Sequence, residues 1–101
     1  MKVDFSTELT NLNGETLKDG NNPLTLKTIC VNAVGGKYQD ENLTVEQHVD
    51  RFMLASKIHK SNGDGLDLSS EEIVTIKKLL AKSAYIPIVV GQACQMLEGK
   101  S

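Results

Sequence analysis

Apolar residues recur at intervals of three and four in four stretches of this chain, and polar or glycine-containing connections separate the stretches. This spacing places side chains on one face of a helix, so each stretch predicts an amphipathic helix. The four predicted helices span residues 24–35, 44–60, 69–84 and 87–98.

Start signals support three of these helices. Thr44 is followed three residues later by Gln47, and Ser69 by Glu72, which is the spacing of a capping box. Pro87 suits the first helical position, where its missing N–H costs nothing. We therefore expect helices to begin at these points.

The second helix has apolar residues at Val45, Val49, Phe52 and Met53. Their helical spacing predicts that they form its buried face, together with Ser56.

Residues 3–19 are predicted to be extended, with a β-hairpin turning at Asn13-Gly14. The glycine- and proline-containing stretch 19–23 reads as a second turn that ends the hairpin. The sequence thus predicts a single α+β domain over 1–101, an N-terminal β-hairpin packed on about four short α-helices.

The 101 residues carry a formal net charge of −2, and only 4% are aromatic. The core is therefore expected to be aliphatic, and the charge balance gives no sign of nucleic-acid binding. No apolar run is long enough to span a membrane, and the first residues lack the apolar segment of a secretory signal.

Cys30 and Cys94 are isolated in the sequence, and each falls on the predicted apolar face of a helix. This placement favours free buried thiols over a disulfide and indicates a reducing, cytoplasmic compartment.

One loop resembles a calcium site. Asn62, Asp64, Gly65 and Glu71 match the third, fifth, sixth and twelfth positions of a helix-loop-helix calcium loop. Lys60, however, stands at the first position, where a carboxylate ligand belongs. We reject a metal site here and interpret the segment as a glycine-rich connector before a capped helix.

A cluster of lysines is the candidate nucleic-acid patch, because phosphate contacts need little more than grouped positive charge. It would contain Lys57, Lys60, Lys77, Lys78 and Lys82. Lysines near helix C-termini are also expected from the helix dipole alone, and no aromatic side chain is interleaved to stack on bases.

Gly91 interrupts the last predicted helix. Glycine inside a helix is destabilising relative to alanine, so it usually serves close packing. We expect a second backbone to approach Gly91, Ala93 and Cys94 within the fold; the alternative is a dimer seam at these residues.

Catalytic motifs are absent from the sequence, and so are the Gly-rich loops that hold phosphates. His48 and His59 share a helix face but lie about 16 Å apart, too far for joint metal ligation. We expect neither an enzyme nor a cofactor.

Three segments together resemble small proteins of about this length encoded by tailed bacteriophages and prophages. The segments are Pro23-Leu-Thr-Leu-Lys27 with Val31-Asn-Ala33, Leu68-Ser-Ser-Glu-Glu-Ile73, and Ile86-Pro-Ile-Val-Val-Gly-Gln-Ala93. The resemblance implies a phage origin and a bacterial cytoplasm. It carries over no catalytic residues, because that family has no assigned activity.

Two functions follow as hypotheses. The first is a non-enzymatic phage accessory protein, an assembly factor or a binder of a host protein, that acts on a protein partner or on itself as a homo-oligomer. The alternative is a nucleic-acid-associated regulatory protein that uses the lysine patch.

We predict that millimolar calcium changes neither the melting temperature nor the helicity of the protein, because Lys60 replaces the first ligand. Thermal unfolding followed by circular dichroism, with and without calcium, tests this. A calcium-dependent rise in melting temperature would contradict it.

Overall fold

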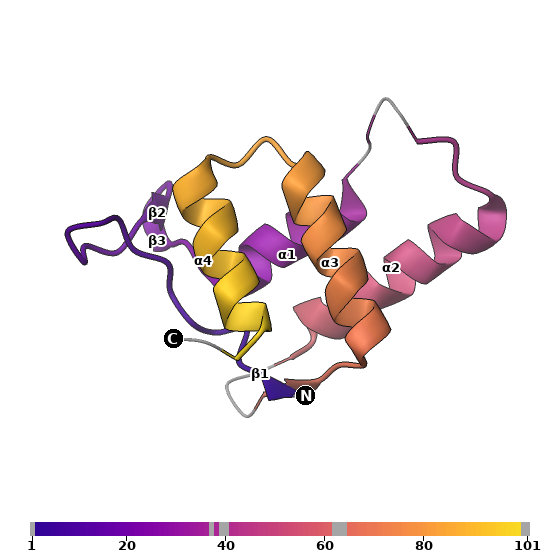
Figure 1. Ribbon diagram of the computed structural model, residues 1–101, viewed down its shortest axis with the longest axis horizontal. Helices are drawn as coiled ribbons and strands as arrows, with labels where there is room; N and C mark the ends of the chain where they lie inside the picture. Colours follow the sequence, from indigo (N-terminus) through magenta and orange to yellow (C-terminus); the bar gives the residue numbers. More distant parts are fainter. Residues whose placement is uncertain (1, 37, 39–40, 62–64, 100–101) are drawn as a thin grey trace.

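The computed structural model describes residues 2–36, 38, 41–61 and 65–99 (Figure 1). Its helices are α1 (Leu26–Gly35), α2 (Val45–His59), α3 (Ser70–Lys82) and α4 (Pro87–Leu97). Its strands are β1 (Lys2–Val3), β2 (Lys18–Asp19), β3 (Asn22–Pro23) and β4 (Leu66–Asp67). The α+β class is confirmed, and each predicted helix lies within two residues of its observed ends.

The other helices are arranged around α1. In Figure 1, α3 and α4 run side by side in opposite directions, and α1 crosses behind them. α1 packs against both α2 and α3, whereas direct contact between α2 and α3 is slight. α1 therefore positions the other two helices.

The caps are as the sequence predicts. Thr44 and Gln47 form a complete capping box at the start of α2, and Ser69 and Glu72 form one at the start of α3. α1 begins two residues later than predicted because Thr25 caps it, accepting a hydrogen bond from the N–H of Thr28.

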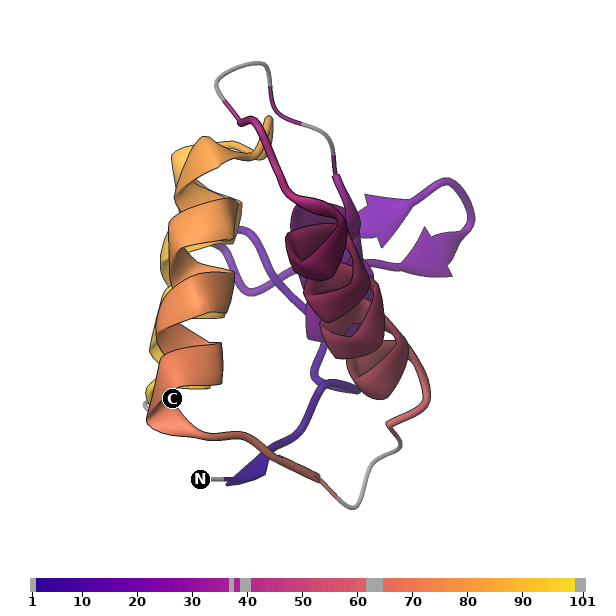
Figure 2. The same cartoon turned by 90° about the vertical axis from the view of Figure 1, so that its right-hand side faces the viewer.

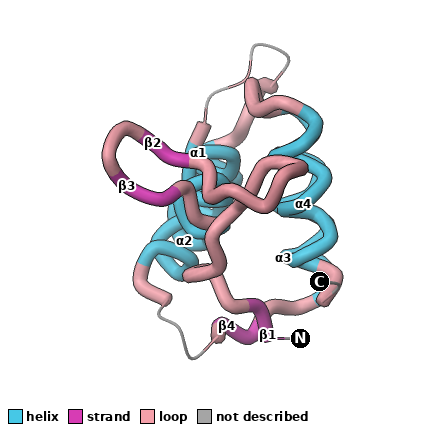
Figure 3. Tube along the Cα trace, turned by 90° about the vertical axis from the view of Figure 1, so that its left-hand side faces the viewer, coloured by secondary structure: helices cyan, strands magenta, loops and turns pink. Residues whose placement is uncertain are grey.

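The strands differ from the predicted hairpin over 3–19. β1 pairs with β4, antiparallel, and not with a neighbouring segment. The regular hairpin joins β2 and β3 and projects from the body of the molecule (Figure 3). The Asn13-Gly14 turn does form, closed by a hydrogen bond of 2.9 Å from the N–H of Asn11 to the carbonyl of Glu15, but it carries only an isolated bridge.

The reason for this difference is the burial of Leu9. Its side chain is fully buried, and its N–H donates to the carbonyl of Leu24 at 2.8 Å. Its carbonyl accepts from the N–H of Leu17, also at 2.8 Å. The backbone segments at Leu9, Leu17 and Leu24 thus meet around one core residue. The N-terminal segment bends to bury the Leu9 side chain and does not form one continuous two-stranded hairpin.

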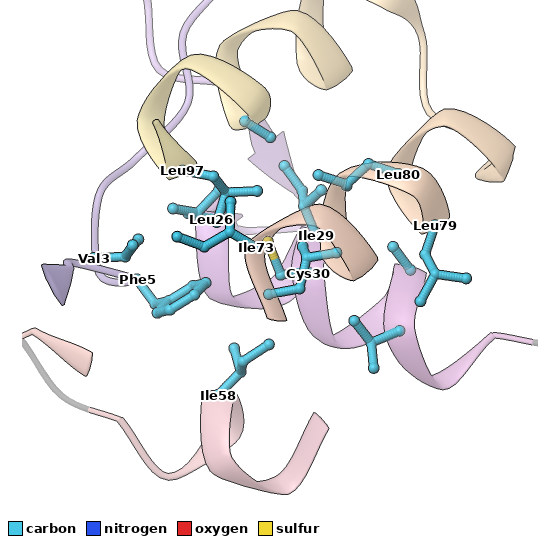
Figure 4. Packing of buried hydrophobic residues seen from close by; sticks show 14 of the residues in the cluster. Val3, Phe5, Leu26, Ile29, Cys30, Ile58, Ile73, Leu79, Leu80 and Leu97 are labelled. Atoms are coloured by element: carbon cyan, nitrogen blue, oxygen red, sulfur yellow. The ribbon is translucent and has the colours of Figure 1, made fainter. Parts of the chain in front are cut away.

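The core is apolar throughout the described residues, and Phe5 is its one aromatic side chain (Figure 4). No described helix is both long and apolar enough to cross a bilayer. The core consists of Val3, Phe5, Leu9, Leu26, Ile29, Cys30, Ala33, Val34, Leu54, Ile58, Leu68, Ile73, Ile76, Leu79, Leu80, Val89, Ala93 and Leu97.

Both cysteines are free, as the sequence predicts. Cys30 is fully buried, and desolvation raises its pKa to about 12. Cys94 is half-buried against the core, and desolvation raises its pKa as well. Both thiols therefore stay protonated near neutral pH, which makes them poor nucleophiles.

The predicted buried face of α2 is wrong. Val45, Val49, Phe52 and Met53 are 79%, 48%, 71% and 62% exposed, and Ser56 is partly exposed. α2 instead meets α1 with its opposite face, on which only two side chains are buried, Leu54 and Ile58.

We predict opposite outcomes for two truncations on α2. Ile58→Ala should lower the free energy of unfolding by about 2–5 kcal/mol because Ile58 is fully buried. Phe52→Ala should change it by less than about 0.5 kcal/mol because Phe52 is largely exposed. Urea unfolding at low protein concentration tests both. A large loss for Phe52→Ala with a small loss for Ile58→Ala would contradict the observed orientation of α2.

Candidate protein-binding surface

An open groove of about 1100 Å³ lies between α2 and α3. It exists because both helices pack on α1 while they touch each other only slightly. Figure 2 views the molecule from the side on which α2 and α3 lie next to each other. The groove is lined by Glu41, Leu43, Gln47, Asp50, Arg51, Met53, Leu54, Lys57, Ser69, Glu71, Glu72, Thr75, Lys78, Leu79, Ala81 and Lys82.

The groove combines apolar side chains with charges of both signs. Its larger apolar residues are Leu43, Met53, Leu54 and Leu79. Its ionisable residues are the acids Glu41, Asp50, Glu71 and Glu72 and the bases Arg51, Lys57, Lys78 and Lys82. Because acids and bases are equal in number, these residues give the groove no net formal charge.

Arg51 organises the end of the groove near the start of α2. Its guanidinium forms an ion pair with Glu41 and donates to the carbonyl of Val34 at 3.2 Å. It also lies 6.0 Å from the centre of the Tyr38 ring. Since Arg51 and Glu41 are mostly buried, this cluster ties α2 to the end of α1.

The two carboxylate oxygens of Glu41 have different surroundings. Oε2 forms the ion pair with Arg51 and lies 3.8 Å from the Nζ of Lys82. The other oxygen, Oε1, is buried and accepts no hydrogen bond within the described part of the chain.

Glu72 lies at the other end of the groove. Its carboxylate accepts a hydrogen bond of 2.9 Å from the backbone N–H of Ser69 and lies 3.2 Å from the Nζ of Lys57. Chiefly the Ser69 hydrogen bond, and then Lys57, lowers the pKa of Glu72. The ionised carboxylate therefore joins the start of α3 to the end of α2.

The structure brings together three of the five lysines in the predicted patch. Lys57, Lys78 and Lys82 line the groove. Lys60 caps the end of α2, and Lys77 contacts Glu98 at 2.5 Å, a hydrogen bond that raises the pKa of Lys77. Carboxylates also contact Lys57 and Lys82, so the patch is largely paired.

The rejected calcium loop is only partly described, because Asn62 and Asp64 lie outside the described residues. Gly65 has a φ of 94°, in the region that favours glycine, and Glu71 lies in the first turn of α3 beside the groove. Over the ranges that the structure describes, no three His, Cys, Asp or Glu residues gather into a candidate metal cluster.

The expected close approach at Gly91 is wrong. A Cβ added there would meet no atom outside its own helix within 4 Å, and Gly91 is exposed. Ala93 is fully buried in the core, and Cys94 packs against it. Ala93 therefore has no surface to offer a dimer seam.

The exposed face of α2 is the feature that sequence reasoning misassigned. We define the outer stripe as Val45, Val49, Phe52 and Met53, which point away from the buried Leu54 and Ile58. Met53 also lines the groove, so the stripe and the groove form one continuous surface. The sequence of α2 contains two apolar sets at helical spacing, the outer stripe and the pair Leu54 and Ile58. Because the two sets lie on opposite faces, the presence of both was a sign that one of them would be exposed.

Comparison with known proteins adds no assignment. No family model matches the chain, and neither a curated protein nor a solved structure matches it.

We predict that Glu72 stabilises the fold in a pH-dependent way. Because its folded pKa is lowered below the ordinary value of 4.5, its contribution is present above that pH and is lost as the pH falls through the folded pKa. Glu72→Gln keeps a side-chain acceptor at the cap, as Gln47 does in α2, but removes the charge. Unfolding free energies of the two proteins should differ by up to about 1 kcal/mol near neutral pH and converge at acid pH. A difference that persists unchanged in acid would contradict this role.

Proposed function

We propose that this chain is a non-enzymatic accessory protein of a tailed phage or prophage that acts by binding a protein partner, a second copy of itself included, through the outer stripe of α2. It would serve as an assembly factor or as a binder of a host protein. The observation that carries the proposal is the exposure of the outer stripe.

The first half of α2 has little packing within the chain, which supports a partner that covers it. Burial of apolar surface stabilises a protein by about 25 cal/mol for each Å² removed from water, and exposed apolar side chains lack this contribution. Helices in proteins draw most of their stability from packing, yet every residue from 45 to 50 is exposed. Within the described part of the chain, the capping box and the cluster at Arg51 are the contacts that hold this half of α2 in place. A partner on the stripe would supply the missing packing.

The groove suits a protein partner as well. Protein interfaces combine an apolar centre with polar groups at the edge, and the groove has Leu54 and Leu79 beside charges of both signs.

The convergence of Lys57, Lys78 and Lys82 on the groove favours the alternative, a nucleic-acid-associated regulatory protein. Carboxylates interleaved among these lysines weigh against it, because they would repel phosphates. Affinity for DNA or RNA that falls steeply with salt would support this alternative over the protein partner.

The phage setting rests on the resemblance of the three sequence segments, and with it the bacterial cytoplasm as the place of action. Two cysteines that form no disulfide are consistent with a reducing compartment.

We predict that Phe52→Glu abolishes partner binding without unfolding the protein. A glutamate at a 71% exposed position is solvated in the free chain but is desolvated under a partner. Tagged protein in phage-infected or lysogenic cells, cross-linked and analysed by mass spectrometry, should retain a specific partner that the variant loses.

Leu12→Glu is the matched control. Leu12 is 88% exposed near the Asn13-Gly14 turn, so the same change in chemistry falls far along the chain from the outer stripe. The proposal requires that this variant keep the partner. Equal loss of the partner in both variants, or no specific partner in either the parent or the control, would overturn it.

A further inference from the structure

The charges beside the outer stripe have an ordered distribution. Glu46, Met53 and Lys60 are seven residues apart, so they follow one edge of α2, with an acid at one end and a base at the other. Asp50 and Lys57 repeat the order on the groove side, acid first and base second. All four charged residues are exposed.

In two antiparallel copies of α2, the acidic end of each helix lies beside the basic end of the other. If a second α2 lies antiparallel on the first, with a two-fold axis beside Met53, Glu46 of each copy faces Lys60 of the other. The same axis gathers Phe52 and Met53 of the two copies around it, whereas Val49 of each copy lies level with Lys57 of the other. The charged edge therefore sets the register, and within the outer stripe Phe52 and Met53 are the residues that meet apolar side chains of the other copy.

We propose that the protein bound by the outer stripe is a second copy of this chain, docked α2 on antiparallel α2. This inference rests on the proposed function, because it names the partner of the same surface. A two-fold contact of this kind is isologous and closes as a dimer, so it leaves no stripe free to extend a filament.

The charges favour the antiparallel arrangement. In a parallel pair Glu46 of both copies would lie at one end and Lys60 of both at the other, so no ion pair between Glu46 and Lys60 could form. In the antiparallel pair the aliphatic stem of Lys60 also extends over Val45 of the other copy while its ammonium meets Glu46.

The contact is small. α2 has 15 residues and a length of about 22 Å, so one helix on one helix falls at the low end of interface sizes. The dimer should therefore dissociate on dilution, and its formation should be visible in sedimentation velocity over a range of protein concentrations.

The decisive experiment is a charge exchange. Glu46→Lys and Lys60→Glu each create two repulsive pairs in the symmetric dimer, so each variant alone should dimerise more weakly, by about tenfold or more. In a heterodimer of the two variants, both ends of the contact again join a lysine of one chain to a glutamate of the other. The mixture should recover the dimer that neither variant forms alone. Both changes also oppose the dipole of α2, but mixing cannot repair that intrachain effect, so recovery reports the interface.

The control pair is Glu15→Lys and Lys18→Glu, which exchanges exposed charges in the N-terminal segment. These variants should dimerise like the parent, alone and mixed. Phe52→Glu should be monomeric at every concentration at which the parent is a dimer. Circular dichroism verifies that each variant keeps its helices.

Three outcomes would overturn the inference. The first is a parent chain that stays monomeric at high concentration; if Phe52→Glu still loses a different protein in infected cells, the proposed function survives while the self-association fails. The second is a dimer that Phe52→Glu leaves intact, which would place the interface elsewhere. The third is a dimer that forms equally well for all charge variants, which would remove the antiparallel register.

Discussion

The burial of α1 is the constraint on which the rest of the structure depends. Leu26, Ile29, Cys30, Ala33 and Val34 are at most 1% exposed, so packed neighbours cover one face of the helix along its whole length. α2 and α3 both pack on α1 and have little direct contact with each other. The groove between α2 and α3 is a direct consequence of this arrangement.

The same constraint explains the outer stripe. α1 offers α2 one side only, and Leu54 and Ile58 occupy it. The remaining apolar residues of α2 then face outward, where no element of the described chain covers them. In a chain with a core built almost wholly of aliphatic side chains, the outer stripe is therefore a set of large apolar side chains left in solvent.

Local signals were read correctly from the sequence. The capping boxes at Thr44 and Ser69 and the turn at Gly14 depend on residues within a few positions of each other, so nearby chemistry suffices to predict them. The face of α2 was misread because Val49 and Ile58 belong to two apolar sets of equal helical spacing. Choosing between them requires knowing where α1 lies. The grouping of the lysines also depends on tertiary structure: Lys77 and Lys78 are adjacent in sequence, but Lys78 lines the groove and Lys77 contacts Glu98.

By itself, the sequence determined the number of helices, their approximate ends and the aliphatic nature of the core, because periodicity and capping are properties of short segments. Only the tertiary structure decided that β1 pairs with β4 across the chain, that Leu9 gathers three segments, and that α2 turns the face containing Phe52 to solvent. These outcomes depend on which segments compete for the surface of α1. That competition is settled by packing between distant residues, which no local pattern encodes.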